Sequence, residues 1–413
     1  MAVYRNPLFL VVPGFPAFSC RHPARRARVR SQCVGARAYA APVLNTHPSE
    51  SIEEIERRAV SWVEGLDKTE KTGSRHHTVP RFYLDRFADN GRLWVRDRAA
   101  DLAPGTGSAR HVRDMGVKDF YTSLTVDDVL DSRLEQVLSL VEAQGAAVLA
   151  RLLSPFRLAG PLTADEEVHL SQFLSFQVVR GQRWRREMEL MGDWYAKTLA
   201  SSHHSQADLK QVRFVPHPND HLRMLGQAAQ ELQPWLLGRP CVVVILDRPL
   251  MLTCDEPVIF RCDNPVEHLP DCGMSEEEFR RRTKKKKGRK GTDRRTVHMY
   301  PARPRGAAFA YEIILPLAPS KLLVLGPQGS RSQPVRCLRG REAESFAAEI
   351  NSELIANAYG WIAGHPDNQE FRAREFDPPG ALLNVCDGGS FMSEEMQEAP
   401  APRSVARLRA GRL

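Results

Sequence analysis

The hydrophobic pattern of the chain changes near residue 240, from the spacing of helices to that of strands. Before this point, segments 128–153 and 163–200 repeat apolar residues every three or four positions. After it come short apolar runs typical of strands, at 241–246, 250–253, 258–260, 307–315 and 321–325. Segment 341–363 returns to the helical spacing. This order predicts an α+β fold, in which amphipathic helices pack with a small mixed or antiparallel sheet.

The helix expected at 163–200 has a clear start signal and a polar interior. Thr163 and Glu166 have the spacing of a capping box. Further along, Gln177 lies in the middle of the apolar stripe and Arg180 lies near its edge. Burying an unpaired amide costs roughly 2–7 kcal/mol, and a guanidinium costs more, so both side chains need partners. After this helix, 201–220 is expected to be a polar loop.

The net positive charge of the chain comes from three segments. The formal net charge is +8, but residues 1–49, 280–295 and 399–413 carry +7, +10 and +4, which leaves −13 for the remainder. We therefore expect an acidic folded body at 50–386 as a single α+β domain, with a disordered or targeting extension at 1–49. Segment 280–295 is expected to be a basic loop, and 387–413 a disordered tail.

The cysteine usage and the hydropathy indicate an intracellular protein. The eight cysteines include no C-x-x-C pair, and scattered thiols are typical of a reducing compartment. No apolar stretch approaches the roughly 20 residues needed to span a bilayer. We expect a cytoplasmic location, with organelle targeting by the Arg-rich residues 1–49 as the alternative.

One short block carries the strongest local motif of the chain. His77, Val79, Pro80, Tyr83, Leu84 and Phe87 match the pattern H-x-V-P-x-x-Y-L-x-x-F. Through this block the chain resembles the domain-of-unknown-function family 4238. Later blocks of the same resemblance are Asp119–Tyr121, Gln177 with Arg180, Thr253–Pro257, Pro316–Pro319 and Asn351, so that it covers about 74–363. Thr78 and Cys254 stand where the family often has Tyr and Ser. The resemblance implies no activity.

A catalytic hypothesis follows from the polar residues themselves. Glu135 and Glu142 are seven residues apart and share a helix face at the rim of the core. If His77 and Asp255 converge on them, the four side chains form a metal or acid–base site, the metal being unknown. A divalent ion there activates water for hydrolysis, with nucleic acid as one candidate substrate. The candidate substrate-binding residues are Gln177, Arg180, Tyr83 and Tyr121.

The alternative hypothesis is a non-catalytic binding, interaction or regulatory module. In this case Arg180 pairs with Glu135 or Glu142 to fix helix register, and His77 bonds a backbone carbonyl. Asp255 is then an ordinary turn residue. The basic loop Arg280–Arg295 either binds nucleic acid by counterion release or is a solvated insertion. The two hypotheses differ in whether His77, both glutamates and Asp255 share one point.

Overall fold

The protein was analysed as a computed structural model. It describes residues 66, 75–119, 124–126, 129–154, 161–201, 203–216, 218–262, 298–301, 306–330, 335–379, 382–386 and 404–407. The extension at 1–49 and the basic loop at 280–295 lie outside the described residues. Of the predicted tail at 387–413, only Ser404–Arg407 is described.

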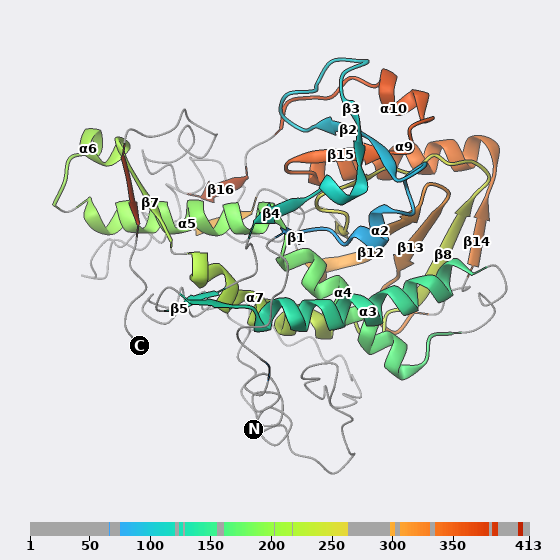
Figure 1. Ribbon diagram of the computed structural model, residues 1–413, viewed down its shortest axis with the longest axis horizontal. Coiled ribbons are helices and arrows are strands. Elements are labelled where there is room, and N and C mark those ends of the chain that lie inside the picture. The colour runs from blue at the N-terminus through green and yellow to red at the C-terminus, as the bar shows by residue number, and fades with distance from the viewer. Residues whose placement is uncertain are drawn as a thin grey trace, which may run out of the picture.

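Three packed helices form one side of the molecule. They are α3 (Arg133–Leu153), α4 (Ala164–Val179) and α7 (Pro218–Leu232), with α4 packed against both others (Figure 1). Helix α3 begins later than the sequence predicts, because 129–131 form strand β6. It is the one described helix long and apolar enough to cross a bilayer. Since its buried face packs along α4, the described chain has no clear membrane span.

The helix predicted at 163–200 is in fact two helices. The capping box is present, because the Thr163 Oγ1 atom accepts from the Glu166 N–H and the Glu166 carboxylate accepts from the Thr163 N–H at 2.8 Å. However, α4 ends at Val179, and Gly181 is the N-cap of a separate helix, α5 (Gln182–Ala200). The prediction of one continuous helix is therefore wrong, because Glu256, from a distant part of the chain, caps the start of α5.

A five-stranded mixed sheet packs on the helices. Its strand order is β10–β12–β13–β8–β14, and β14 is parallel to β8 whereas the other neighbours are antiparallel. The strands are β8 (Cys241–Leu246), β10 (Ile259–Cys262), β12 (Ala310–Ala318), β13 (Lys321–Leu325) and β14 (Val335–Leu338). Strands β8 and β13 have the bounds that the sequence predicts. The α+β class, with amphipathic helices on a mixed sheet, is confirmed.

A second sheet has the order β3–β2–β15–β9. It is formed by β2 (Arg92–Asp97), β3 (Ser108–His111), β9 (Thr253–Cys254) and β15 (Trp361–Gly364). The predicted last helix, 341–363, is too long: α9 runs from Gly340 to Asn357, and the run from Trp361 is a strand. All four residues of β15 are buried, as expected for a strand covered on both faces.

The remaining elements are short. Pairs of small strands are β1 (Arg75–His77) with β4 (Val117–Asp119), β5 (Leu124–Val126) with β6 (Val129–Asp131), β11 (His298–Pro301) with β16 (Leu383–Cys386), and β7 (Val212–Val215) with β17 (Ser404–Arg407). The short helices are α2 (Arg81–Leu84), α6 (Gln206–Lys210) and α10 (Gln369–Ala373). The segment 201–220 thus contains α6 and β7, where the sequence predicts only loop.

One apolar cluster joins the helices to both sheets. It contains Phe173 and Leu174 of α4, Leu323 of β13, Leu354 of α9 and Ile362 of β15, each at most 2% exposed. Burial of this size is the main source of stability in a domain. Helices α3, α4 and α9 therefore share one core with both sheets, whereas Leu225 and Ala229 of α7 form a smaller cluster with Val179.

A buried arginine attaches the C-terminal segment to this core. Arg96 of β2 has no exposed surface, and its guanidinium donates to the backbone carbonyls of Asp101, Leu102, Ala103, Phe371 and Arg374. Its charged group also lies 3.8 Å from the centre of the Phe376 ring. The segment around 371–376 is therefore part of the fold, beyond the limit at 363 that the resemblance gave.

Candidate functional site

The predicted site residues fall into separate contact groups. Arg180 Nη1 lies 2.5 Å from Glu142 Oε1, and Arg180 Nη2 donates to Gln177 Oε1 at 2.7 Å. Gln177 in turn donates to the Thr78 carbonyl at 3.2 Å. Gln177 and Arg180 are each 2% exposed, so the expected burial with partners is observed. This group links α3, α4 and the chain after β1.

The histidine next to Glu135 is not the one that the sequence indicated. His76 Nδ1 lies 3.7 Å from Glu135 Oε2, whereas His77 Nδ1 lies 3.2 Å from the Met115 carbonyl oxygen. Successive side chains of a strand point to opposite faces, so neighbours in β1 have different surroundings. His77 has the backbone contact expected under the alternative hypothesis.

Tyr83 and Asp255 are both buried, and each has its own partners. The Tyr83 hydroxyl lies 2.9 Å from Thr253 Oγ1, and burial raises the pKa of Tyr83. The Asp255 carboxylate accepts the N–H groups of Tyr359 at 3.0 Å and Gly360 at 2.6 Å, one on each oxygen. Tyr121 lies outside the described residues. Within the described ranges, no group of three or more His, Cys, Asp or Glu side chains could hold a metal ion.

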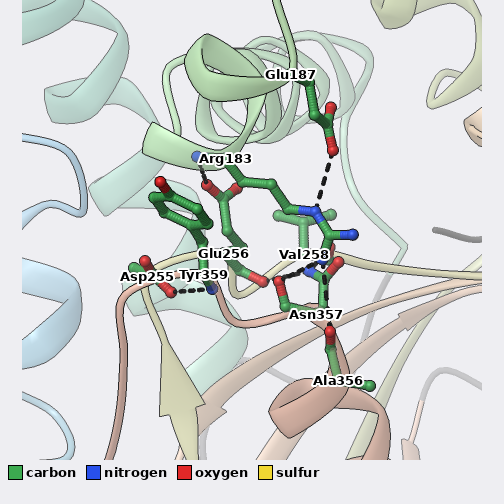
Figure 2. A network of polar contacts seen from close by, with 8 residues as sticks. All are labelled: Arg183, Glu187, Asp255, Glu256, Val258, Ala356, Asn357 and Tyr359. Carbon is green, nitrogen blue, oxygen red and sulfur yellow. Dashed lines mark hydrogen bonds and ion pairs between the residues drawn. The ribbon is translucent and has the colours of Figure 1, made fainter. Parts of the chain in front are cut away.

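A denser polar network surrounds Asp255, which is the only one of its members that the sequence analysis singled out. Figure 2 shows Arg183 at the start of α5, Glu256 in the turn after β9 and Asn357 at the end of α9. Arg183, Asp255 and Glu256 are at most 4% exposed. Arg183 donates from Nε to Glu187 at 3.0 Å, one helical turn along α5. We call Arg183, Glu187, Asp255, Glu256 and Asn357 the helix-end network.

Glu256 caps the first turn of α5. Its Oε1 atom accepts the backbone N–H of Arg183 at 3.0 Å, which is one of the amides left without an intrahelical partner at a helix start. A carboxylate at this end is also stabilised by the helix dipole. The carboxylate fills the space beside Gly181, where an added Cβ would lie 2.1 Å from Glu256 Oε1. Glu256 therefore requires glycine at 181, and its bond to the Arg183 N–H supports the start of a new helix at Gln182.

Arg183 and Arg98 satisfy the end of α9. Arg183 Nη1 donates to the carbonyls of Asn357 at 3.0 Å and Ala356 at 3.4 Å, and Arg98 Nε donates to the Ile355 carbonyl at 2.9 Å. The last carbonyls of a helix carry partial negative charge, so two guanidinium groups are favourable there. The Asn357 amide closes the network by donating to the Glu256 carbonyl at 2.6 Å.

Burial raises the pKa of Asp255 from 3.8 to about 6, although the N–H groups of Gly360 and Tyr359 act in the opposite direction. Loss of hydration therefore outweighs the donated hydrogen bonds. Burial likewise raises the pKa of the neighbouring Cys254 thiol. Both oxygens of Asp255 accept backbone N–H groups and the residue is 1% exposed, so Asp255 holds the chain after α9.

The fold and this network define an α+β protein whose helix ends are joined by buried charges. Residues 75–279 match the model of a family described as "Protein of unknown function (DUF4238)". Residues 75–279 belong to this family, as the resemblance indicated, and the blocks at Pro316–Pro319 and Asn351 lie beyond the match. The matched region includes Arg183 and Glu256, whereas Asn357 and Tyr359 lie beyond it. Comparison with curated proteins and with solved structures found no match.

The close contact at Gly181 gives a direct mutational test. We expect Gly181→Ala to lower the free energy of unfolding by about 1–3 kcal/mol, because the new methyl group must displace a buried carboxylate. Gly226→Ala, in the middle of α7 with open space beside it, is the matched control and should gain about 0.5–1 kcal/mol. Urea denaturation of both variants measures the difference. Equal effects would contradict the assignment of Glu256 to the cap.

The pKa of Asp255 predicts a pH dependence with a definite sign. The folded state binds this proton more tightly than the unfolded state, whose pKa is close to 3.8. The wild type should therefore lose stability relative to Asp255→Asn as the pH rises from about 4 to about 6, with no further change above. The total loss in the free energy of unfolding, relative to Asp255→Asn, is roughly 3 kcal/mol. Chemical denaturation of both proteins from pH 3.5 to 8 measures it; a difference independent of pH would refute the prediction.

Proposed function

We propose that this protein is a non-catalytic binding module that contacts nucleic acid through its basic loop, Arg280–Arg295. The observation that carries the proposal is that candidate catalytic side chains already have partners within the protein. His77 contacts a backbone carbonyl, Glu142 pairs with Arg180, and both oxygens of Asp255 accept backbone N–H groups. Residues engaged in this way support a scaffold role.

A hydrolytic site makes different demands on these side chains. A divalent ion takes several oxygen ligands around one point and keeps a position for water or substrate. Of the acidic candidates, Glu142 is paired with a nearly buried arginine, and Asp255 is 1% exposed. Breaking either arrangement leaves a buried group without its partner, which is costly. These contacts favour the binding hypothesis over a metal-dependent hydrolase.

The basic loop supplies the binding surface in this proposal. It contains eleven Lys and Arg residues against one Asp, in sixteen positions. The described strands on either side of 263–297, β10 and β11, each pair with another strand. Lys and Arg that neutralise phosphates release counterions, so binding of this kind falls as salt rises.

The proposal predicts a salt-dependent affinity for a single-stranded oligonucleotide. Replacing Lys284, Lys285, Lys286 and Lys287 by Gln should weaken binding. It should also reduce the slope of log K against log salt by about 0.7 for each phosphate that the loop no longer neutralises. The matched control replaces four exposed arginines on the described surface, Arg81, Arg110, Arg113 and Arg336, by Gln. It removes the same charge and should leave most of the slope in place.

Fluorescence anisotropy at several salt concentrations measures both variants. An equal loss of affinity in both would mean that only net charge matters, and it would contradict a role for the loop. Metal-dependent cleavage of the same oligonucleotide, abolished by Glu142→Gln, would contradict the non-catalytic assignment. So would a rise in melting temperature with Mg²⁺, Mn²⁺ or Zn²⁺ that Asp255→Ala abolishes.

A further inference from the structure

One strand at the end of the molecule is attached to the fold along a single edge. Strand β7 lies against α5 at the end of the molecule away from the two large sheets (Figure 1). The backbone N–H of Phe214 donates to Asp193 Oδ1 of α5 at 2.7 Å. Asp193 is itself fixed by Lys197, which lies 2.9 Å away and is 8% exposed. This edge of β7 is therefore closed by a helix.

The opposite edge of β7 accepts a strand from the far end of the chain. Because N–H groups alternate in direction along a strand, Phe214 facing α5 leaves the backbone groups of Arg213 and Val215 on the other side. There β17 runs parallel to β7, with Val405 opposite Arg213 and Arg407 opposite Val215. In a parallel ladder, Arg213 and Val215 both bond to the intervening residue, Ala406.

This pairing has few of the features that make a sheet stable. It has two strands of four residues each, and two-stranded sheets are marginal in water. Parallel pairing is also slightly weaker per residue than antiparallel pairing, and ordering a distant chain end costs entropy. The described β7 has no third strand beside it. A segment held in this way exchanges readily with another extended segment.

We propose that the edge of β7 that faces away from α5 is a strand-addition site for an extended peptide, and that Ser404–Arg407 is the ligand that the chain itself places there. Main-chain hydrogen bonds supply the affinity in such sites, so the ligand class is an extended segment without proline at the paired position. The inference rests on the proposed binding function and adds a second kind of partner to it.

The test uses the full chain and a labelled peptide of residues 401–410. Ala406→Pro in the chain removes the N–H that pairs with β7 and should free the edge. We expect the peptide to bind this variant at least tenfold more tightly than it binds the wild type, whose edge is occupied. The same peptide carrying Ala406→Pro keeps the positive charge and should bind neither protein.

Two results would overturn the inference: no binding of the peptide to the Ala406→Pro chain, or equal binding of the two peptides. Amide hydrogen exchange in the wild type is an independent check, since the Ala406 N–H should be protected and an unprotected amide would also overturn it. Oligonucleotide binding by the Ala406→Pro chain separates the two proposals. If it persists while peptide binding fails, only the strand-addition site is lost.

Discussion

The start of α5 and the end of α9 lie at the same buried site, and the turn after β9 joins them. Glu256 caps the start of α5, while Arg183 of α5 binds the carbonyls at the end of α9. The turn itself is held by Asn357 and, through Asp255, by the backbone at 359–360. Each helix therefore depends on a residue supplied by another element (Figure 2).

The arrangement explains how charged residues can be buried so deeply. Each of Arg183, Glu187, Asp255 and Glu256 would be costly alone in a nonpolar interior. Here the charges face helix ends of opposite polarity, backbone donors and one another, which offsets much of the lost hydration. The same pattern recurs at Arg96, whose described hydrogen-bond acceptors are all backbone carbonyls. Buried polar residues in this protein hold segments together, and this is why we assign them to the scaffold.

The sequence predicted those elements whose pattern is local. Strands β8 and β13 and the capping box of Thr163 depend on neighbouring residues, and they were predicted correctly. The break at Gly181 depends on the carboxylate of Glu256, which is far away in the sequence. A glycine after Arg180 was the only local signal for it. Likewise, the apolar run from Trp361 fits a helix or a buried strand equally well, and only pairing with β2 and β9 decides.

The candidate site could be predicted only in part from the sequence, because its local features are visible there and its distant contacts are not. The need of Gln177 and Arg180 for partners followed from their places on a buried stripe, and the pairing with Glu142 is as the alternative hypothesis expected. The choice of His77 over His76 followed a motif, whereas burial against Glu135 depends on which face of β1 each residue occupies. The role of Glu256 beside Asp255 is not predictable locally, because nothing in the sequence indicates which carboxylate lies at a helix start.

Amide hydrogen exchange in Glu256→Ala tests the central claim most directly. The substitution removes the cap and leaves the Arg183 amide without its acceptor. If one network joins the helix ends, protection should fall together in the first turn of α5 and at 355–360 around the end of α9. The control is Glu344→Ala. Glu344 lies on α9 and forms an exposed ion pair with Arg248, so its loss should change neither region. Loss of protection in α5 alone, with 355–360 unchanged, would contradict the account.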